Sequence, residues 1–265
     1  MKSNNVFERV EKKYLIDQNK FNLFFQYIKP YMTVDKFGLH TICNIYYDTD
    51  NYELIRNSIE KPKYKEKLRL RSYGVPKDND NVFLEIKKKY DGTVFKRRIN
   101  LSLKEAVDYL DYGIRPNRHS QILNEIDYFI NFHKPTKKVL IAYERLALFA
   151  KDDADFRITF DHNIRSRTYD LHLSKGDYGN PTLDFDSYLI EIKTSSSIPL
   201  WLVEIMSQLN IYPASFSKYS TVYKQDLIHS IDYKNQSYEQ FIINENQLSE
   251  NISNYWRNEN CLQVH

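Results

Sequence analysis

The sequence is poor in cysteine and glycine. Cys43 and Cys261 are the only cysteines among its 265 residues, which excludes a disulfide scaffold or a thiolate zinc cluster and fits a reducing compartment. Its six glycines form neither a G-x-G-x-x-G nor a G-x-x-x-x-G-K motif, and this argues against a Rossmann dinucleotide site and a P-loop. Any phosphate group that the chain binds must therefore be held by side chains.

Long hydrophobic runs and a large excess of one charge are also missing. No stretch of about 18 apolar residues occurs, so we expect no membrane span. Residues 1–5 lead into a charged segment and not into the apolar part of a secretory signal. Lys and Arg number 38 against 35 Asp and Glu, an excess too small for a nucleic-acid coat but compatible with a local basic site. These features predict a cytoplasmic protein with no nucleic-acid partner.

Apolar residues make up 42% of the chain and suffice for a sizeable core. Period-two alternation predicts strands at about 6–15, 40–48, 65–73, 82–90, 93–99, 138–149, 155–162 and 183–193. Helical spacing predicts helices at about 18–30, 103–112, 118–132, 199–210 and 218–230. Since no repeat or linker interrupts this pattern, we expect one α+β domain over residues 1–234 and a loosely packed tail over 235–265.

Charged residues recur at every second position of the predicted strands. In 65–73, Lys67, Arg69 and Arg71 share one face, whereas Leu68 and Leu70 take the other. Six other predicted strands, all but 40–48, repeat this arrangement, with polar-face residues Arg9, Glu11, Lys13, Glu85, Lys87, Lys89, Lys96, Arg98, Tyr143, Arg145, Arg157, Thr159, Asp161, Glu191 and Lys193.

Two interpretations account for these faces. The first is a half-solvated antiparallel sheet with its charges in water. The second is a closed barrel with a charged interior and an apolar exterior covered by helices. Recurrent arginines with a few carboxylates favour the second interpretation, because planar guanidinium groups bind phosphate bidentately and carboxylates hold the divalent metals that bridge phosphate oxygens.

The charged segments, in their order along the chain, resemble those of the VTC domain, the polyphosphate polymerase domain of the vacuolar transporter chaperone complex. More distantly, they resemble the triphosphate tunnel metalloenzyme (CYTH) superfamily. The similarity covers roughly residues 6–224. The segments that carry it are Arg9–Tyr14, Lys67–Tyr73, Phe83–Lys87, Phe95–Arg98, Tyr143–Arg145, Phe156–Asp161, Leu189–Lys193 and Phe216–Tyr219.

The resemblance implies an eight-stranded antiparallel β tunnel clad by helices. It also implies an ATP-dependent polyphosphate polymerase that transfers the γ-phosphate of ATP to a growing polyphosphate chain with Mn²⁺ or Mg²⁺, so that ATP, polyphosphate and orthophosphate are the expected ligands. The cations implied to act on phosphate are Lys13, Arg69, Arg71, Lys87, Lys96, Arg145, Arg157 and Lys218. The further residues implied to bind substrate are Tyr143, Arg98, Lys193 and Ser217. Glu191 is the implied metal ligand, with Glu11 and Glu85 as second choices.

The sequence departs from the family pattern at two places. Arg9 replaces the first carboxylate of the superfamily's opening Glu-x-Glu-x-Lys, which fits the VTC branch better than a simple tripolyphosphatase. Ser215 stands where the eukaryotic domain carries a lysine three positions before Lys218. The phosphate-sensing SPX domain and membrane helices of eukaryotic relatives have no counterpart, so the chain resembles stand-alone bacterial members.

Two alternative functions stay open beside the polymerase. One is an inorganic triphosphatase or nucleoside triphosphatase, in which water replaces the phosphate acceptor. The other is a non-catalytic module that binds polyphosphate or nucleotide without turnover.

Overall fold

A computed structural model of the chain describes residues 10–91, 93–195 and 197–227. The chain divides into two compact units, Met1–Thr221 and Val222–His265, and the first contains the sheet. The boundary expected at residue 234 and the tail expected from residue 235 lie outside the described residues.

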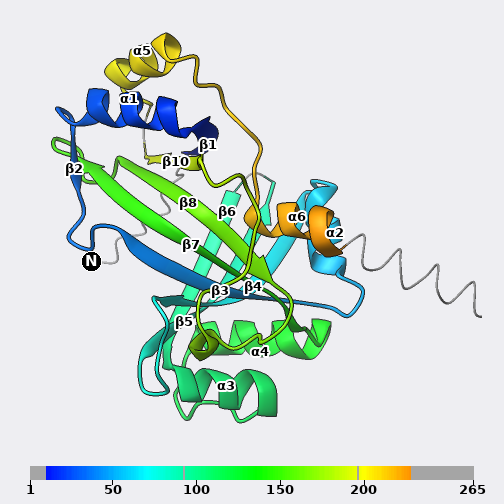
Figure 1. Ribbon diagram of the computed structural model, residues 1–265. Helices are drawn as coiled ribbons and strands as arrows, with labels where there is room; N and C mark the ends of the chain where they lie inside the picture. Colours follow the sequence, from blue (N-terminus) through cyan, green and yellow to red (C-terminus); the bar gives the residue numbers. More distant parts are fainter. Residues whose placement is uncertain (1–9, 92, 196, 228–265) are drawn as a thin grey trace, which may run out of the picture. The chain divides into compact units, whose positions relative to one another are not determined.

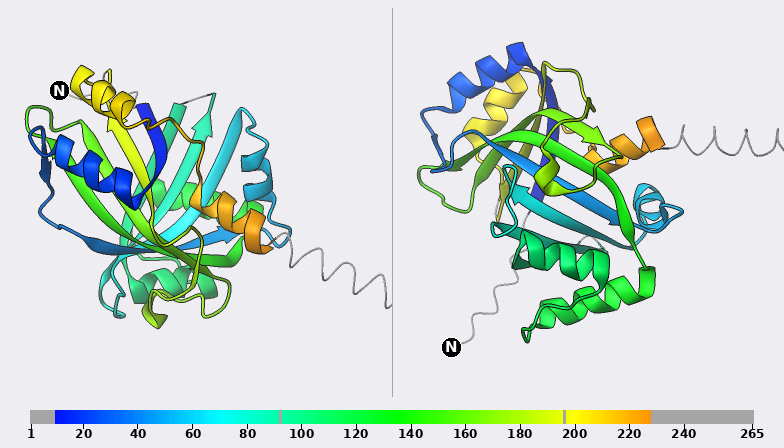
Figure 2. Two further views of the ribbon diagram at one scale, coloured as in Figure 1. Left: turned by 45° about the horizontal axis from the view of Figure 1, so that its top comes forward. Right: turned by 60° about the horizontal axis from the view of Figure 1, so that its bottom comes forward.

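The first unit is built on one antiparallel sheet, and its strands curve around a common axis (Figures 1 and 2). The main hydrogen-bonded order is β1-β10-β8-β7-β3-β4-β5-β6, with β2 beside β7 and β9 beside β8. The strands are β1 (Val10–Asp17), β2 (Met32–Val34), β3 (His40–Asp48), β4 (Tyr64–Tyr73), β5 (Asn81–Tyr90), β6 (Thr93–Ser102), β7 (Thr136–Ala150), β8 (Arg157–Arg167), β9 (Asn180–Pro181) and β10 (Ser187–Thr194).

The antiparallel α+β architecture is confirmed, but the sheet has ten strands and is not closed. Among the described residues, no ladder joins the two end strands, β1 and β6. The free edge of β1 is met by an irregular segment, in which Ala214 N–H donates to the carbonyl oxygen of Lys13 at 2.7 Å and Pro213 forms an isolated bridge with Tyr14. Proline has no N–H to donate, so this pairing does not extend into a further strand.

Helices cover the outer face of the sheet in two pairs, α1 with α5 and α3 with α4 (Figure 1). The described helices are α1 (Gln18–Ile28), α2 (Glu53–Ile59), α3 (Leu103–Tyr112), α4 (Gln121–His133), α5 (Leu200–Gln208) and α6 (Lys218–Val222), with a 3₁₀ turn η1 (Leu173–Lys175) and a π-helical turn η2 (Tyr223–Leu227). A capping box starts α3, where Ser102 and Glu105 each accept a hydrogen bond from the other's backbone N–H. None of the described helices is long and apolar enough to cross a membrane.

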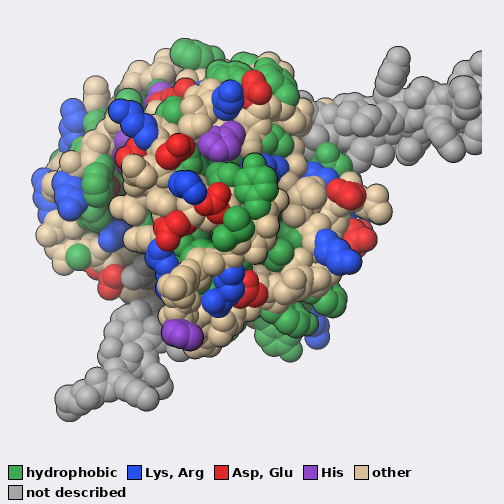
Figure 3. All heavy atoms as spheres, turned by 90° about the horizontal axis from the view of Figure 1, so that it is seen from below, with side chains coloured by type: hydrophobic (Ala, Val, Ile, Leu, Met, Phe, Trp, Pro, Cys, Tyr) green, Lys and Arg blue, Asp and Glu red, His purple; other side chains and the backbone are tan. Residues whose placement is uncertain are grey.

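Two apolar cores lie between the sheet and its helices. The first packs Leu68 and Leu84 of the sheet against Ala106 of α3 and Phe129 of α4. The second packs strands β1, β8 and β10 against α1 and α5. On the face over α3 and α4, acidic and basic side chains are interspersed (Figure 3). The apolar strand positions are therefore used on the outer side, which leaves the charged positions for the inner side.

Some elements differ from the sequence expectations. Helix α2 was not expected from the sequence, because no capping residue marks its start. Its N-cap residue, Tyr52, has a left-handed backbone conformation and makes no side-chain capping hydrogen bond. Its first turn is instead held by the buried carboxylate of Asp48, which accepts hydrogen bonds from the N–H groups of Leu54 and Ile55 at 2.9 and 3.0 Å. The short strands β2 and β9 were also not expected, and the helix expected over 218–230 is α6 followed by η2 in its described part.

Candidate functional site

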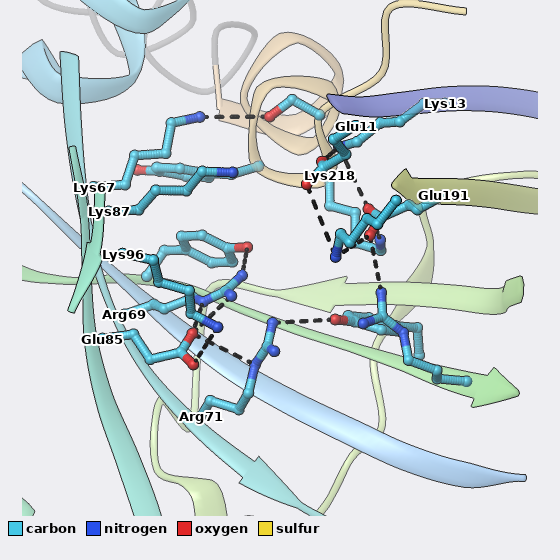
Figure 4. A pocket seen from close by; sticks show the side chains of 16 residues that line it. Glu11, Lys13, Lys67, Arg69, Arg71, Glu85, Lys87, Lys96, Glu191 and Lys218 are labelled. Carbon is cyan, nitrogen blue, oxygen red and sulfur yellow. Dashed lines mark hydrogen bonds and ion pairs between the residues drawn. The ribbon is translucent and has the colours of Figure 1, made fainter. Parts of the chain in front are cut away.

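The inner side of the curved sheet holds a pocket of about 190 Å³ (Figure 4). One water needs about 10–15 Å³ on such a measure, so the pocket has room for an extended polar ligand. It is lined by Glu11, Lys13, Tyr46, Lys67, Arg69, Arg71, Glu85, Lys87, Lys96, Tyr143, Arg145, Glu191, Lys193, Ser217, Lys218 and Tyr219.

One side of the pocket, which we call the cation wall, is formed by β4, β5 and β6. Its charged residues are Lys67, Arg69, Arg71, Glu85, Lys87 and Lys96. Glu85, with 1% of its side chain exposed, lies 2.7 Å from Arg69 and 2.8 Å from Lys96. Burial alone would raise the pKa of Glu85, but Arg69, Arg71 and Lys96 outweigh it and lower the pKa to about 2. The carboxylate is therefore ionised at neutral pH and holds three cations together.

Two tyrosines continue the cation wall towards the next strands. Arg69 donates to the hydroxyl of Tyr46 at 3.2 Å, and Arg71 donates to Asn44 at 2.8 Å and to the hydroxyl of Tyr143 at 3.4 Å. Burial would raise the pKa of both phenols, but nearby cations, Arg69 beside Tyr46 and Arg71 beside Tyr143, lower it. These phenols thus accept hydrogen bonds from the guanidinium groups and fix their orientation.

The opposite side, which we call the mixed wall, is formed by β1, β7, β8, β10 and the start of α6. Its charged residues are Glu11, Lys13, Arg145, Asp161, Glu191, Lys193 and Lys218. Arg145 makes a bidentate pair with fully buried Asp161 at 2.6 and 2.7 Å, and Lys218 lies 2.5 Å from the same carboxylate. Burial would raise the pKa of Asp161, but Arg145 and Lys218 lower it. Asp161 therefore acts as an anion that positions two pocket cations.

Glu191 lies at the centre of the mixed wall. Its carboxylate is 3.4 Å from both Lys13 and Arg145 and 3.5 Å from Lys193. Despite its burial, the surrounding cations, with Lys218 the strongest, hold the pKa of Glu191 well below its usual range. Glu11 on the adjacent strand contacts the same two lysines, Lys13 and Lys193, at 3.7 and 3.8 Å.

Ser217 and Lys218 reach the pocket from outside the sheet. The backbone contact of Ala214 with β1 and the hydrogen bond from Lys13 Nζ to the Phe216 carbonyl, at 3.1 Å, bring this segment across the open edge. Ser217 then begins α6, where its hydroxyl accepts from Ser220 N–H at 3.4 Å. Tyr219 anchors the helix by donating to Asp48 at 3.0 Å.

The structure brings most of the predicted site residues together. Those that line the pocket are Lys13, Arg69, Arg71, Lys87, Lys96, Tyr143, Arg145, Lys193, Ser217 and Lys218, with Glu11, Glu85 and Glu191. Arg157 and Arg98 are not among the lining residues. Arg157 is exposed at the first position of β8 and lies over the ring of Phe149, and Arg98 is exposed on β6 and lies over Phe83. Both are on the expected sheet face, but near its end or outer strand.

Sequence reasoning missed four residues of the site. Lys67 and Asp161 had been placed on the polar strand faces without being assigned a role, so the alternation contained the necessary signal. Tyr46 and Tyr219 were not selected, and they stack with ring centroids 4.9 Å apart beside Arg69. No local pattern identifies such a pair, because the two rings are 173 residues apart in the sequence.

The acidic residues can be tested as metal ligands. The described residues contain no group of three or more Asp, Glu, His or Cys side chains suited to a metal ion. Mg²⁺ sites that bind phosphates commonly use only one or two carboxylates together with substrate oxygens and water. Glu191 and Glu11 fit that donor set, whereas Glu85 is enclosed by three cations of the cation wall.

The fold and the site define an antiparallel α+β protein whose curved sheet carries a basic pocket on its inner side, suited to a polyanion. The sequence model of the VTC domain family matches residues 8–225, and the chain belongs to this family.

Comparison with one solved structure supports the fold, and a second structure shows a weaker similarity. A candidate adenylate cyclase from Bacillus halodurans is similar with a TM-score of 0.52 and 17% identity, over 79% of this chain and 93% of that chain. HpAC1 from Hippeastrum, a candidate adenylyl cyclase described as having a dominant triphosphatase activity, aligns with a TM-score of 0.47 and 15% identity, over 82% and 95% of the two chains. A search of curated proteins gave no significant match.

Proposed function

We propose that this chain is a metal-dependent polyphosphate polymerase that transfers the γ-phosphate of ATP to the end of a polyphosphate chain. The observation that carries the proposal is the pocket, in which nine Lys and Arg side chains from both walls converge on one space. Such a concentration of cations matches a ligand with several adjacent phosphate groups. Membership of the VTC family supports the same ligand class.

The proposed phosphoryl transfer requires that the reacting phosphates be held in line and that the negative charge of the transition state be stabilised. A terminal oxygen of the acceptor phosphate attacks the γ-phosphorus, the bond from that phosphorus to the β–γ bridging oxygen breaks, and ADP leaves with the electron pair. Negative charge on the transferring group is met by the guanidinium groups of Arg69 and Arg71, which Glu85, Tyr46 and Asn44 hold in place. No side-chain nucleophile is needed for this in-line transfer.

Arg145 and Lys218 would bind the nucleotide or the chain from the mixed wall. Asp161 is a positioning residue in this scheme, because it orients both cations and is itself fully buried. A bidentate contact leaves the guanidinium plane of Arg145 fixed before the ligand arrives, which lowers the entropy lost on binding.

A divalent metal, Mn²⁺ or Mg²⁺, would be held by Glu191, with Glu11 as the second carboxylate. When bound, the metal supplies positive charge shared between phosphate oxygens. The low pKa of Glu191 keeps it ionised and available as an oxygen ligand at neutral pH. Lys13 and Lys193 form ion pairs with the carboxylate of Glu191 in the structure. With a metal ion bound to this carboxylate, both lysines would be available to bind phosphate.

One assay separates the proposed reaction from its alternatives. The purified chain is incubated with ATP and Mn²⁺ or Mg²⁺, long-chain products are resolved on a gel, and orthophosphate is measured in parallel. Polymer with matching ADP supports the polymerase. Orthophosphate without polymer identifies a triphosphatase, and binding of ATP with neither product identifies a non-catalytic module.

A further inference from the structure

Three lysines of the cation wall stand directly opposite one another across three neighbouring strands. Lys67 of β4 pairs with Lys87 of β5, and Lys87 pairs with Lys96 of β6. We call these residues the lysine row. Like charges placed directly opposite each other destabilise a sheet, whereas in the neighbouring row Arg69 faces Glu85 and the charges compensate. The lysine row is therefore a local cost to folding that a bound anion would remove.

Two members of the row form no ion pair with a carboxylate in the part of the chain that the structure describes. Lys96 lies 2.8 Å from Glu85, but among the residues that the structure describes no carboxylate forms an ion pair with Lys67 or Lys87. Lys67 Nζ instead lies 3.5 Å from the hydroxyl of Ser217. The side chains of Lys67 and Lys87 both extend from the sheet into the pocket (Figure 4).

We propose that Lys67, which stands beside Ser217 and opposite Lys87, is a further phosphate-binding cation of the pocket and takes up a proton from solvent as the anion binds. This inference deepens the proposed function and rests on it for the identity of the ligand.

The surroundings of Lys67 explain the link to protons. Burial is the largest influence, and Lys87 on β5, Lys13 on β1 and Lys65 on its own strand add repulsion, while Tyr46 on β3 acts in the opposite direction. Together they lower the pKa of Lys67 to about 8. An anion beside Nζ favours the ammonium form and raises this pKa, so binding near pH 8 consumes protons. The affinity for the anion should therefore be highest below pH 8, where Lys67 is already protonated, and should fall as the pH rises above 8.

The test is calorimetric titration of inorganic tripolyphosphate into the intact chain, with chelator present, at pH 7 and pH 9. At pH 8, two buffers with different ionisation enthalpies give the number of protons taken up. Lys67→Met removes the charge, and Lys67→Arg keeps a charge that does not titrate in this range. Lys65→Met is the matched control, because Lys65 lies on the same strand and donates to the Ser58 carbonyl outside the pocket.

We expect Lys67→Met to weaken binding about tenfold at pH 7, as for the loss of one charge-assisted contact, and Lys65→Met to change it less than about twofold. Lys67→Arg should bind at pH 7 like the wild type, lose less affinity at pH 9 and take up fewer protons. Burial also lowers the pKa of Lys87, and it lowers that of Lys96 to about 8, so these two lysines account for the remaining uptake.

The inference is overturned if Lys67→Met binds like the wild type, or if Lys67→Arg keeps the wild-type proton uptake and pH profile. In that case polymer formation by the same preparations would leave the proposed function intact. Conversely, tripolyphosphate binding with the expected Lys67 effects, but without turnover of ATP, would retain the lysine row and reject the polymerase. Absence of tripolyphosphate binding would overturn both.

Discussion

The cation wall and the mixed wall face the same pocket with different charge balances. The cation wall carries five cations and a single carboxylate, Glu85, which pairs with three of them. On the mixed wall four cations are accompanied by three carboxylates, Glu11, Asp161 and Glu191. Most of the uncompensated positive charge of the pocket, which a bound polyanion would meet, therefore lies on β4, β5 and β6.

This difference assigns separate tasks to the two walls. The cation wall offers two cations to phosphate oxygens, since neither Lys67 nor Lys87 forms an ion pair in the described part of the chain. The mixed wall offers carboxylate oxygens. These oxygens can ligate a divalent cation, but they repel a phosphate group because both are negatively charged. Substitutions that remove one kind of charge from one wall should therefore affect phosphate binding, metal binding and folding to different degrees.

The largest expected effect is on turnover, from Arg69→Ala in the cation wall. Arg69 is held by Glu85 and Tyr46 and faces the pocket. Removing one preorganised charge from a transition state costs about 10²–10³ in rate. We expect a loss of this size in the rate of ATP consumption, measured with saturating metal.

Arg97→Ala is the control for this variant. Arg97 lies on β6, is half-exposed, and is 3.9 Å from Glu125 on α4, away from the pocket. Its removal should leave turnover within about twofold. If both arginine variants kept wild-type rates, the cation wall would have no part in catalysis.

The second effect is on stability, from Glu85→Gln. The pKa of Glu85 is about 2 in the folded chain, against 4.5 for a glutamate outside the folded structure. This difference means that ionised Glu85 contributes about 3 kcal/mol to the free energy of unfolding at neutral pH. Because the folded pKa is depressed, this contribution is complete above pH 4.5 and is lost as the pH falls towards 2. Denaturant unfolding should show Glu85→Gln less stable at pH 7, with the difference disappearing at low pH.

Glu125→Gln provides a comparison for the stability measurement. Glu125 forms long ion pairs of 3.9 Å with Lys88 and Arg97 at the surface, and such pairs contribute about 0–1 kcal/mol. An equal loss of stability in both glutamate variants at pH 7 would contradict the organising role of Glu85.

The third effect is on metal affinity, from Glu191→Gln in the mixed wall. Loss of one of two carboxylates should weaken Mn²⁺ binding by about tenfold or more. Tripolyphosphate affinity in chelator should hold or rise, because the variant removes a negative charge from the pocket. Calorimetric titration of Mn²⁺ and of tripolyphosphate measures the two halves separately.

Unchanged Mn²⁺ affinity in Glu191→Gln would make Glu191 an ion-pair partner of Lys13 and Lys193 only. Glu11→Gln is the companion variant, since Glu11 contacts the same lysines at longer distances. A larger loss in Glu11→Gln than in Glu191→Gln would reverse the order of the two ligands.

The strand faces could be predicted from sequence because they depend only on alternation. Leu68 and Leu70 point to the outer core while Arg69 and Arg71 point inward, and this follows from the pleat of a single strand. The capping box at Ser102 was likewise a local signal. Alternation therefore identified the charged inner face and most of its cations.

Features that depend on register could not be predicted in this way. The lysine row exists only because Lys67, Lys87 and Lys96 fall opposite one another, and alternation does not fix how strands slide along each other. The place of Lys218 depends on an irregular segment crossing the open edge of β1, for which only the family resemblance gave an indication. Asp48 supports α2 from a position outside that helix, so the usual capping spacing was absent.

The smallest expected effect comes from Arg157→Ala. The resemblance placed Arg157 among the phosphate-binding cations, but in the structure it is exposed at the start of β8 and lies 4.8 Å from the ring centroid of Phe149. Because Arg157 is neither in the pocket lining nor paired with a carboxylate among the described residues, its loss should change turnover less than about threefold. A parallel measurement on Arg69→Ala gives the scale.

A hundredfold loss in Arg157→Ala would contradict this and would mean that the side chain leaves Phe149 and turns inward when a polyanion is bound. Phe149→Leu separates these cases, because it removes the ring that Arg157 covers while leaving the arginine in place. If Arg157 acts only at the surface, Phe149→Leu should also leave turnover near the wild-type rate. If Arg157 reaches the ligand, freeing it from the ring should strengthen tripolyphosphate binding, and the boundary of the site would then extend from the pocket to the first residue of β8.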